Sequence, residues 1–420
     1  MPRQDPSVKV MISLTQRNKM AELFKKYHIL TYGCQMNKND SERMAGLLEN
    51  LGFEPSQTWQ EANLVLLNTC SIRDKAERRV FGQLHELHHY RKTHSKDMEL
   101  GVMGCMPQHA QAFIREKLPF VDYVVGVNNM EDLPNFLGHG YTLSQQLEQL
   151  RTRRTKKDVN RFEHKLAKQV RASGKKAWIS IQFGCNKVCS FCIVPYTRGI
   201  EISREKEAIF KEIAALHEKN VTEIVLLGQN VNSYGMTIYD DYRFADLLRE
   251  TATKFPWLEK IDFLTSYPSD VTQELIEVIA SYPNITNEIH FPLQHGDDSI
   301  LKAMRRRYTV AEYRLKVQQL RNRIPDVRLG TDLIVGFPGE TEEHFLNMLA
   351  VLSEIRFDFA NTAAYSPRPK TRAARLPHQV PDQIKRKRLH RLNEHLQAIY
   401  KTNDNNPHFT QTNPHLAQAR

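Results

Sequence analysis

Short apolar segments alternate with helical stretches along most of this 420-residue chain, and this alternation constrains the fold more than any other feature. In the first third of the chain, three such segments each precede a helical pattern, and a fourth apolar segment follows them; they are residues 26–34, 62–70, 98–105 and 121–126. Strands that alternate with helices predict a parallel sheet with right-handed crossovers. We therefore expect an N-terminal α/β domain over residues 25–140, with its ligands at the carboxyl edge of the sheet.

Each of the first three apolar segments ends in a cysteine, namely Cys34, Cys70 and Cys105. Because the carboxyl ends of parallel strands meet at one edge of a sheet, these residues are expected to converge. Three interpretations remain open. The cysteines are buried packing residues, or zinc ligands with His28 or His109 as the fourth ligand. In the third interpretation they hold a cubane iron–sulfur cluster through three thiolates, which fits the ligand count better.

The other three cysteines form a CxxxCxxC array of Cys185, Cys189 and Cys192, just after a strand candidate at Ala177–Gln182. One loop with this spacing can hold a [4Fe–4S] cluster by three thiolates and leave one iron open for a substrate or cofactor. A structural zinc site is disfavoured, since no histidine lies within ten residues of the array to complete a tetrahedron.

Five further strand candidates follow, with helical stretches between them; they are residues 222–228, 260–266, 287–293, 327–336 and 357–365. Together with the first, they make six strand–helix units, which predict an open (β/α)6 partial TIM barrel over residues 177–402. Active sites of such barrels lie at the carboxyl ends of the strands. Gln229, Asn230 and Gly336 fall at such ends and are candidate cofactor-binding residues, with a plain turn role as the alternative.

Positive charge is concentrated in a few places. The formal net charge is +11, and Arg151–Lys176 holds eleven Lys or Arg with only Asp158 and Glu163 as acids. We interpret residues 141–176 as a basic linker, which is either simply solvated or a strip that contacts the phosphates of a nucleic acid. A second basic run is Lys385–Arg388, and Arg305–Arg307 are further candidates for phosphate contacts.

The chain ends and the hydropathy pattern give three more expectations. Residues 403–420 are polar and rich in Asn, Pro and Gln, so we expect a disordered tail. No apolar run approaches the ~20 residues of a membrane span. The N-terminal stretch lacks the apolar core of a secretory signal. We therefore expect no membrane partner and a cytoplasmic protein.

Four motifs narrow the class of protein further: GCNKVCSFCIVPYTRG, LLGQNVNSYG, FPLQHGDDSILKAMRRRYT and TDLIVGFPGETEE. With the three dispersed cysteines before them, they closely resemble the methylthiotransferases among the radical S-adenosylmethionine enzymes. The resemblance runs from about Tyr27 to about Tyr400. Within that group the chain is most similar to the tRNA 2-methylthio-N6-isopentenyladenosine synthases, through VPYTRG and GQNVNSYG.

The resemblance implies two [4Fe–4S] clusters. An auxiliary cluster would be held by Cys34, Cys70 and Cys105. A second cluster, held by the CxxxCxxC array, would bind and cleave S-adenosylmethionine. One S-adenosylmethionine would methylate a sulfur at the auxiliary cluster, and another would yield the radical that removes hydrogen from carbon 2 of the isopentenylated adenine. The implied partners are the anticodon stem-loop of tRNA and an electron donor such as a flavodoxin or ferredoxin. We expect a monomer, and no side chain is assigned as a catalytic acid or base.

The sequence departs from the family pattern twice. The chains of relatives usually end in a small β-barrel that helps to bind RNA, whereas only about 20 polar residues follow Tyr400 here. We therefore expect that barrel to be absent and the basic strips to bind the RNA. Lys370 stands where relatives usually carry Gly, which would permit a positive φ. Three alternatives remain: a methylthiotransferase acting on threonylcarbamoyladenosine in tRNA, one acting on a ribosomal-protein aspartate, or a non-catalytic iron–sulfur protein that binds RNA.

Overall fold

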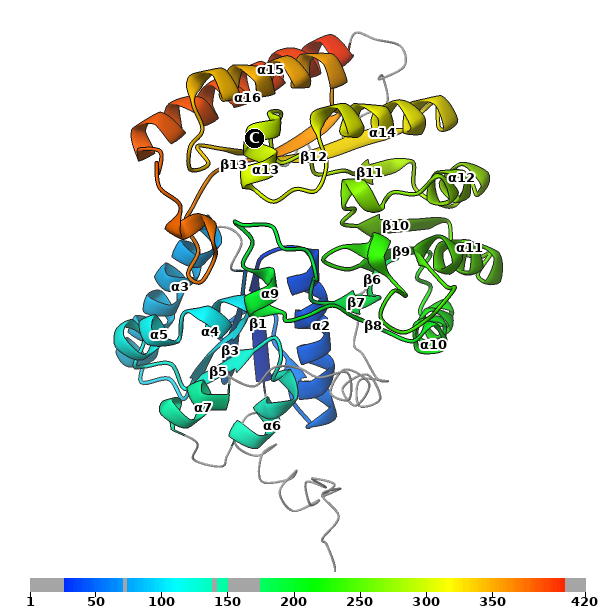
Figure 1. The fold of residues 1–420 in the computed structure, drawn as a ribbon. Coiled ribbons are helices and arrows are strands. Elements are labelled where there is room, and N and C mark those ends of the chain that lie inside the picture. Colours follow the sequence, from blue (N-terminus) through cyan, green and yellow to red (C-terminus); the bar gives the residue numbers. More distant parts are fainter. Residues whose placement is uncertain (1–25, 71–73, 138–141, 150–173, 405–420) are drawn as a thin grey trace, which may run out of the picture. The chain divides into compact units, whose positions relative to one another are not determined.

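The computed structural model describes residues 26–70, 74–137, 142–149 and 174–404 (Figure 1). They divide into two compact units, one within Met1–Ser173 and one within Gly174–Arg420. Each unit has its own apolar core. Among the described residues, no helix combines the length and the apolar character needed to cross a membrane.

The first unit is built on a five-stranded parallel sheet with the strand order β2-β1-β3-β4-β5. Its strands are β1 (Lys26–Tyr32), β2 (Glu54–Pro55), β3 (Leu64–Thr69), β4 (Glu99–Gly104) and β5 (Tyr123–Gly126). The four strands expected from the sequence are present and parallel. β2 was not expected, because two exposed residues at a sheet edge leave no hydrophobic pattern.

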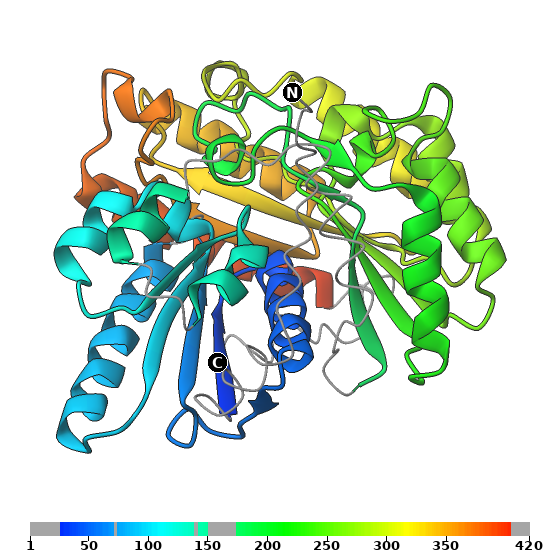
Figure 2. The ribbon, with the colours of Figure 1, turned by 90° about the horizontal axis from the view of Figure 1, so that it is seen from below.

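Helices cover both faces of this sheet, as Figure 2 shows. On one face, α2 (Gln35–Asn50) and α6 (Leu133–Phe136) pack on side chains of all four long strands. On the other face lie α3 (Asp74–Thr93), α5 (Gln111–Lys117) and α7 (Leu143–Gln149). Two short helices complete the unit: α4 (Cys105–His109) and η1 (Met130–Asp132). Because β3 to β5 are buried on both sides, they are apolar without alternation.

Part of the segment that we expected to be a linker, 141–176, instead forms helix α7. Gln146 is buried and accepts a hydrogen bond from the Val124 amide (2.8 Å), and its Nε2 donates to the Asp122 carbonyl (2.9 Å). Leu147 joins the apolar core beside β5. Leu143, at the i−4 position, packs against the same core, so one buried amide and two leucines dock this short helix. Residue 141 and residues 150–173 of that segment lie outside the described residues.

The second unit contains six parallel strands in sequential order, which confirms the predicted open (β/α)6 barrel. They form two three-stranded sheets, β10-β9-β6 and β11-β12-β13. The strands are β6 (Lys176–Ser180), β9 (Glu223–Leu227), β10 (Lys260–Leu264), β11 (Glu288–His290), β12 (Arg328–Val335) and β13 (Phe359–Ala364). The sheets join where Ile261 donates to Asn284 O (2.7 Å) and accepts from Thr286 N (2.9 Å).

Helices cover one face of the curved sheet (Figures 1 and 2). They are α10 (Lys206–His217), α11 (Phe244–Lys254), α12 (Gln273–Ser281), α13 (Asp298–Ala303), α14 (Val310–Arg323), α15 (Glu342–Ile355) and α16 (Asp382–Asp404). One continuous core joins these helices to the strands. Helix α16 continues past 402, where we expected the barrel unit to end: Asn403 is buried and bonded to Arg356 and the Phe357 carbonyl. The rest of the predicted tail, residues 405–420, lies outside the described part.

Candidate functional site

The first cysteine triad lies at the carboxyl edge of three neighbouring strands, as predicted. Cys34 follows β1 and caps α2, Cys70 follows β3, and Cys105 follows β4 as the first residue of α4. The Cys70 amide donates to the Tyr32 carbonyl (3.1 Å), which ties two of these strand ends together. None of the three is in a disulfide; Cys70 and Cys105 are buried and Cys34 is half-buried.

A buried pair of amides lies beneath this edge. Asn37 Nδ2 donates to Asn68 Oδ1 (3.0 Å) and to the Thr69 carbonyl (3.1 Å), and Asn68 Nδ2 donates to the Asn37 carbonyl (2.7 Å). Two glycines leave the space for it. A Cβ on Gly33 would lie 2.3 Å from Asn37 Oδ1, and one on Gly104 would lie 2.4 Å from Asn68 Oδ1. The pair therefore fixes the backbone that carries the triad.

The second triad lies in the cysteine loop, residues 184–193, which runs from β7 (Gln182–Phe183) to α9 (Val194–Thr197). Strand β7 pairs antiparallel with β8 (Ile202–Ser203) and closes the base of the loop. Burial, with the nearby Cys189 thiol as a smaller cause, raises the pKa of Cys185 to about 11 and that of Cys192 to about 12. The three thiols therefore lie close enough to interact, and metal binding would displace their protons.

Two distant segments hold the cysteine loop in place through Ser190. The Ser190 amide donates to the Met304 carbonyl (2.9 Å) and its Oγ to the Ala303 carbonyl (2.8 Å), just after α13. The Ser190 carbonyl accepts from the Ala373 amide (2.8 Å), in the loop after β13. Phe191 packs against an apolar cluster that includes Met304 and Ala373. The loop is thus anchored to the second half of the barrel.

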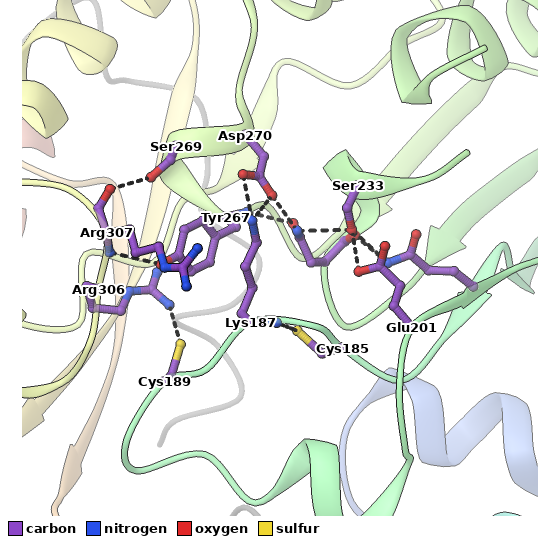
Figure 3. A network of polar contacts seen from close by, with 12 residues as sticks. Cys185, Lys187, Cys189, Glu201, Ser233, Tyr267, Ser269, Asp270, Arg306 and Arg307 are labelled. Carbon is purple, nitrogen blue, oxygen red and sulfur yellow. Dashed lines mark hydrogen bonds and ion pairs between the residues drawn. The ribbon is translucent and has the colours of Figure 1, made fainter. Parts of the chain in front are cut away.

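Arg306 lies beside this triad, as Figure 3 shows. Its Nη1 donates to Cys189 Sγ (3.4 Å) and its Nε to the Tyr308 hydroxyl (2.8 Å). The guanidinium also stacks over the Tyr267 ring at 4.1 Å from the centroid. Arg306 is only 8% exposed. The prediction that it contacts phosphate is therefore wrong, because burial among aromatic rings removes it from the surface; Arg305 and Arg307 are exposed.

A chain of polar contacts continues on the other side of the cysteine loop (Figure 3). Lys187 Nζ lies 2.7 Å from Asp270 Oδ2, and the Lys187 amide donates to Cys185 Sγ (3.4 Å). Asn230 Nδ2 donates to the same Asp270 oxygen (2.6 Å) and to Ser233 Oγ (3.1 Å). Asn230 therefore fixes the Asp270 carboxylate, which in turn forms the ion pair with Lys187. Its predicted contact with a cofactor stays a prediction.

The network ends at a buried carboxyl group. Ser233 Oγ donates to Glu201 Oε2 (2.6 Å), and burial raises the pKa of Glu201. Lys187, Asp270 and Glu201 were not among the candidate site residues, and Arg306 was a candidate for phosphate contact alone. Asp270, Glu201 and Arg306 come from separate loops of the barrel, so no spacing in the sequence connected them to the cysteine array.

Gln229 and Asn232, just after β9, carry buried polar atoms with no hydrogen-bond partner among the described residues. These atoms are Gln229 Oε1 and both Oδ1 and Nδ2 of Asn232. Leaving such a group unpaired costs about 1–3 kcal/mol, which fits residues that bind a polar ligand. Gln229 was a candidate from the sequence and Asn232 was missed. Three amide side chains within residues 229–232 are the signal that could have found it.

Gly336, the third candidate, forms a tight turn after β12. Its φ is 71°, and its amide donates to Glu340 Oε2 (2.7 Å). A Cβ there would lie 2.4 Å from Lys385 Cγ. Gly336 therefore has the turn role that we gave as the alternative, and its contact with a cofactor stays a prediction.

The same contacts correct our interpretation of the second basic run, Lys385–Arg388. Lys385 packs against the Gly336 turn, and Arg388 Nη1 donates to Glu340 Oε1 (2.8 Å). Both side chains are buried, so they are not free to bind RNA; Arg386 and Lys387 are exposed.

The cysteine side chains of both triads are the kind of donor that iron–sulfur clusters use. Among the described residues, no group of three or more His, Cys, Asp or Glu is arranged to hold one metal ion. His28, a candidate zinc ligand, lies in the first half of β1, where its Nδ1 bonds to the Ser56 carbonyl (3.0 Å). Each triad offers three cysteine thiols outside any disulfide, and thiolates are the soft ligands typical of iron–sulfur clusters.

An open six-stranded barrel with a CxxxCxxC loop at its carboxyl edge defines the radical S-adenosylmethionine class. Residues 179–352 match the Radical SAM superfamily, and residues 26–126 match the Uncharacterized protein family UPF0004. The fold resembles a radical S-adenosylmethionine methyltransferase from Kitasatospora setae (TM-score 0.57, 14% identity, 83% of this chain and 77% of that one). It also resembles the cobalamin-dependent radical enzyme OxsB (TM-score 0.53, 12% identity, 89% and 56%).

Similarity to curated proteins is much closer. The chain is 43% identical to a tRNA-2-methylthio-N(6)-dimethylallyladenosine synthase of Dictyoglomus thermophilum, over 90% of this chain and 84% of that protein. It is 44% identical to one of Protochlamydia amoebophila, over 92% and 84%. The chain therefore belongs to the family of tRNA-2-methylthio-N(6)-dimethylallyladenosine synthases.

Proposed function

We propose that this enzyme adds a methylthio group to carbon 2 of N6-isopentenyladenosine next to the anticodon of tRNA, using S-adenosylmethionine and two [4Fe–4S] clusters. The observation that carries the proposal is the family membership over 84% of the length of a relative with this name. The names of the relatives favour this substrate over threonylcarbamoyladenosine and over a ribosomal-protein aspartate.

The two cysteine triads take separate roles in this proposal. Cys34, Cys70 and Cys105 hold the auxiliary cluster, and the cysteine loop holds the second one. When bound, the second cluster supplies the electron that cleaves S-adenosylmethionine. Support comes from the three cysteines outside any disulfide in each place, from the Arg306 guanidinium that donates to Cys189 Sγ, and from the Lys187 amide that donates to Cys185 Sγ.

Polar groups on the neighbouring loops complete the proposed cofactor site. The unpaired amides of Gln229 and Asn232 are available to bind polar groups of S-adenosylmethionine. Asn230 and Asp270 position Lys187 at the cysteine loop. The Gly336 turn brings backbone close to the same edge of the barrel.

Three further proposals follow from this function. A flavodoxin or ferredoxin supplies the electrons, because the reaction needs a one-electron reductant. The anticodon stem-loop is the recognised part of the tRNA. The enzyme acts as a monomer in the cytoplasm, where tRNA is modified.

The test is anaerobic reconstitution of the full chain, followed by iron and sulfide analysis and product detection. About eight iron and eight sulfide per chain are expected for two cubanes. Cys189→Ala should stop 5′-deoxyadenosine formation while about four iron remain. Cys70→Ala should keep 5′-deoxyadenosine formation and stop methylthiolation, so each triad serves as the control for the other. A wild-type protein that carries both clusters and makes no 5′-deoxyadenosine would contradict the proposal.

A further inference from the structure

Three chain segments in the second unit carry positive charge without any acid. They are residues 185–200, 302–309 and 366–378, which hold ten Lys or Arg and no Asp or Glu. The chain as a whole has 59 basic and 48 acidic residues, so the absence of acids in these segments stands out. Charge of one sign in neighbouring loops costs free energy, which a bound polyanion would recover.

These segments form one surface although they are far apart in the sequence. The Ser190 amide bonds to the Met304 carbonyl, and its Oγ to the Ala303 carbonyl. The Ser190 carbonyl accepts from the Ala373 amide. Ser190 lies between Cys189 and Cys192, so both outer segments meet the cysteine loop between two of its thiols.

Four of the ten cations are not available to a ligand at the surface. Lys187 pairs with Asp270, Arg306 donates to Cys189 Sγ, and Arg198 and Arg368 are buried. The other six are exposed, and we call them the basic rim: Lys302, Arg305, Arg307, Lys370, Arg372 and Arg375. Within the described part of the chain, none of the six forms an ion pair.

Three arginines on helices elsewhere on this barrel do form ion pairs. Arg249 lies 2.6 Å from Glu274, Arg314 lies 2.6 Å from Glu354, and Arg323 lies 2.6 Å from Glu277. These helical surfaces balance their charge with carboxylates. The six residues of the basic rim have no such carboxylate partner among the described residues, and they lie on the two segments that are bonded to the cysteine loop.

We infer that the basic rim binds the phosphates of the RNA substrate and so delivers the target base to the cysteine loop. This inference rests on the proposed function, which requires the base to reach the radical source. Arginine forks bind phosphate oxygens in pairs, and four of the six rim residues are arginines. RNA is favoured over an acidic electron-donor protein, because the segments that carry the rim are bonded to Ser190 and so place a bound phosphate beside the loop that the base must reach.

The test measures RNA affinity of the full chain with reconstituted clusters. The probe is a synthetic anticodon stem-loop RNA that carries N6-isopentenyladenosine, titrated at salt concentrations from about 50 to 200 mM. The variants are Arg372→Gln/Arg375→Gln and, on the other outer segment, Lys302→Gln/Arg305→Gln. The matched control, Lys211→Gln/Lys401→Gln, removes the same charge from exposed positions on α10 and α16.

Each rim variant is expected to bind the RNA about tenfold more weakly and to lower the slope of log affinity against log salt by about two, while the control keeps the wild-type slope. Circular dichroism and the thermal midpoint verify folding, and a misfolded variant is replaced by the variant on the other segment. Equal slopes for all variants would overturn the inference. So would a loss of binding to flavodoxin with RNA affinity retained.

The failure of the proposed function is distinguishable from the failure of this inference. If the wild type methylthiolates the RNA while both rim variants bind it as tightly as the control, only the basic rim is refuted. If the loaded wild type neither binds nor modifies the RNA, both the proposed function and the proposed role of the basic rim are refuted.

Discussion

Arg306 Nη1 donates a hydrogen bond to Cys189 Sγ at 3.4 Å, from a guanidinium that the protein holds almost fully buried. The Tyr308 hydroxyl and the Pro292 carbonyl accept two of its other hydrogen bonds, at 2.8 and 3.1 Å. The cation therefore has a fixed place beside a thiol of the CxxxCxxC array. Hydrogen bonds to the ligating sulfurs and local charge set the potential of an iron–sulfur cluster.

Replacing Arg306 with methionine is predicted to make the potential of the cluster in the cysteine loop more negative. The buried cation stabilises the reduced state, which carries one more negative charge. A loss of about 1.4 kcal/mol moves a one-electron potential by about 59 mV, and a shift of that order is expected. A redox titration followed by electron paramagnetic resonance measures it. Arg305→Met, at an exposed neighbour, is the control, and an unchanged potential in a fully loaded Arg306 variant contradicts the prediction.

Asn68→Leu is predicted to destabilise the first unit and to impair loading of the auxiliary cluster. The substitution removes one of the two acceptors of Asn37 Nδ2, which keeps its bond to the Thr69 carbonyl, and the buried N–H left without an acceptor costs about 1–3 kcal/mol. The strand ends that carry the cysteines then lose their support, so iron should fall from about eight toward four per chain.

The matched control for this prediction is Asn63→Leu, which lies just before β3, at the opposite end of that strand. Its amide makes an exposed hydrogen bond to the Asp97 carbonyl. The control should lower the thermal midpoint slightly and keep full iron content. Equal iron in both variants would show that the amide pair has no part in cluster loading.

The sequence was sufficient to predict the arrangement of the strands and the place of both triads. Buried parallel strands have continuous apolar sequences, and a cysteine at the end of such a strand lies at the carboxyl edge of the sheet. That logic placed Cys34, Cys70 and Cys105 on three neighbouring strands although 36 and 35 positions separate them in sequence. It needs only hydrophobic periodicity, which each segment carries in itself.

Burial of charged residues could not be predicted in this way. Arg306 and Arg307 are adjacent and chemically identical, yet the first is buried against Tyr267 and the second is exposed. The difference arises from rings and carbonyls contributed by other loops. Lys385 and Arg388 were misjudged for the same reason, since their partners at Gly336 and Glu340 lie about 50 positions earlier.

Lys370→Gly is predicted to stabilise the second unit by about 1 kcal/mol. Lys370 adopts a φ of 69°, a left-handed conformation that costs a residue with a Cβ about 1–2 kcal/mol and costs glycine almost nothing. Arg372→Gly is the control, because Arg372 in the same loop has a φ of −64° and gains nothing from glycine. Thermal unfolding should therefore shift upward for the first variant and downward for the second. A downward shift for both would contradict the account.

Glu99, the first residue of β4, is predicted to make the stability of the first unit depend on pH. Burial raises the pKa of Glu99 from its ordinary value of 4.5 to about 7, against the effect of a hydrogen bond to Tyr123, and the Asp122 and Asp97 carboxylates add to the rise. Between these two pH values the folded state holds a proton that the unfolded state has released. The free energy of unfolding should therefore fall as pH rises from about 4.5 to about 7.

Glu99→Gln removes this dependence, because the amide keeps the shape and carries no charge at any pH. The variant should match wild type below about pH 4.5 and exceed it by about 1–2 kcal/mol above pH 7, a value reduced to allow for partial solvent screening. Urea unfolding of the full chain at several pH values measures the difference. Glu54→Gln, at an exposed position in β2, should give no such trend. A difference between Glu99→Gln and wild type that stays constant across this range would show that Glu99 is ionised in the folded protein throughout.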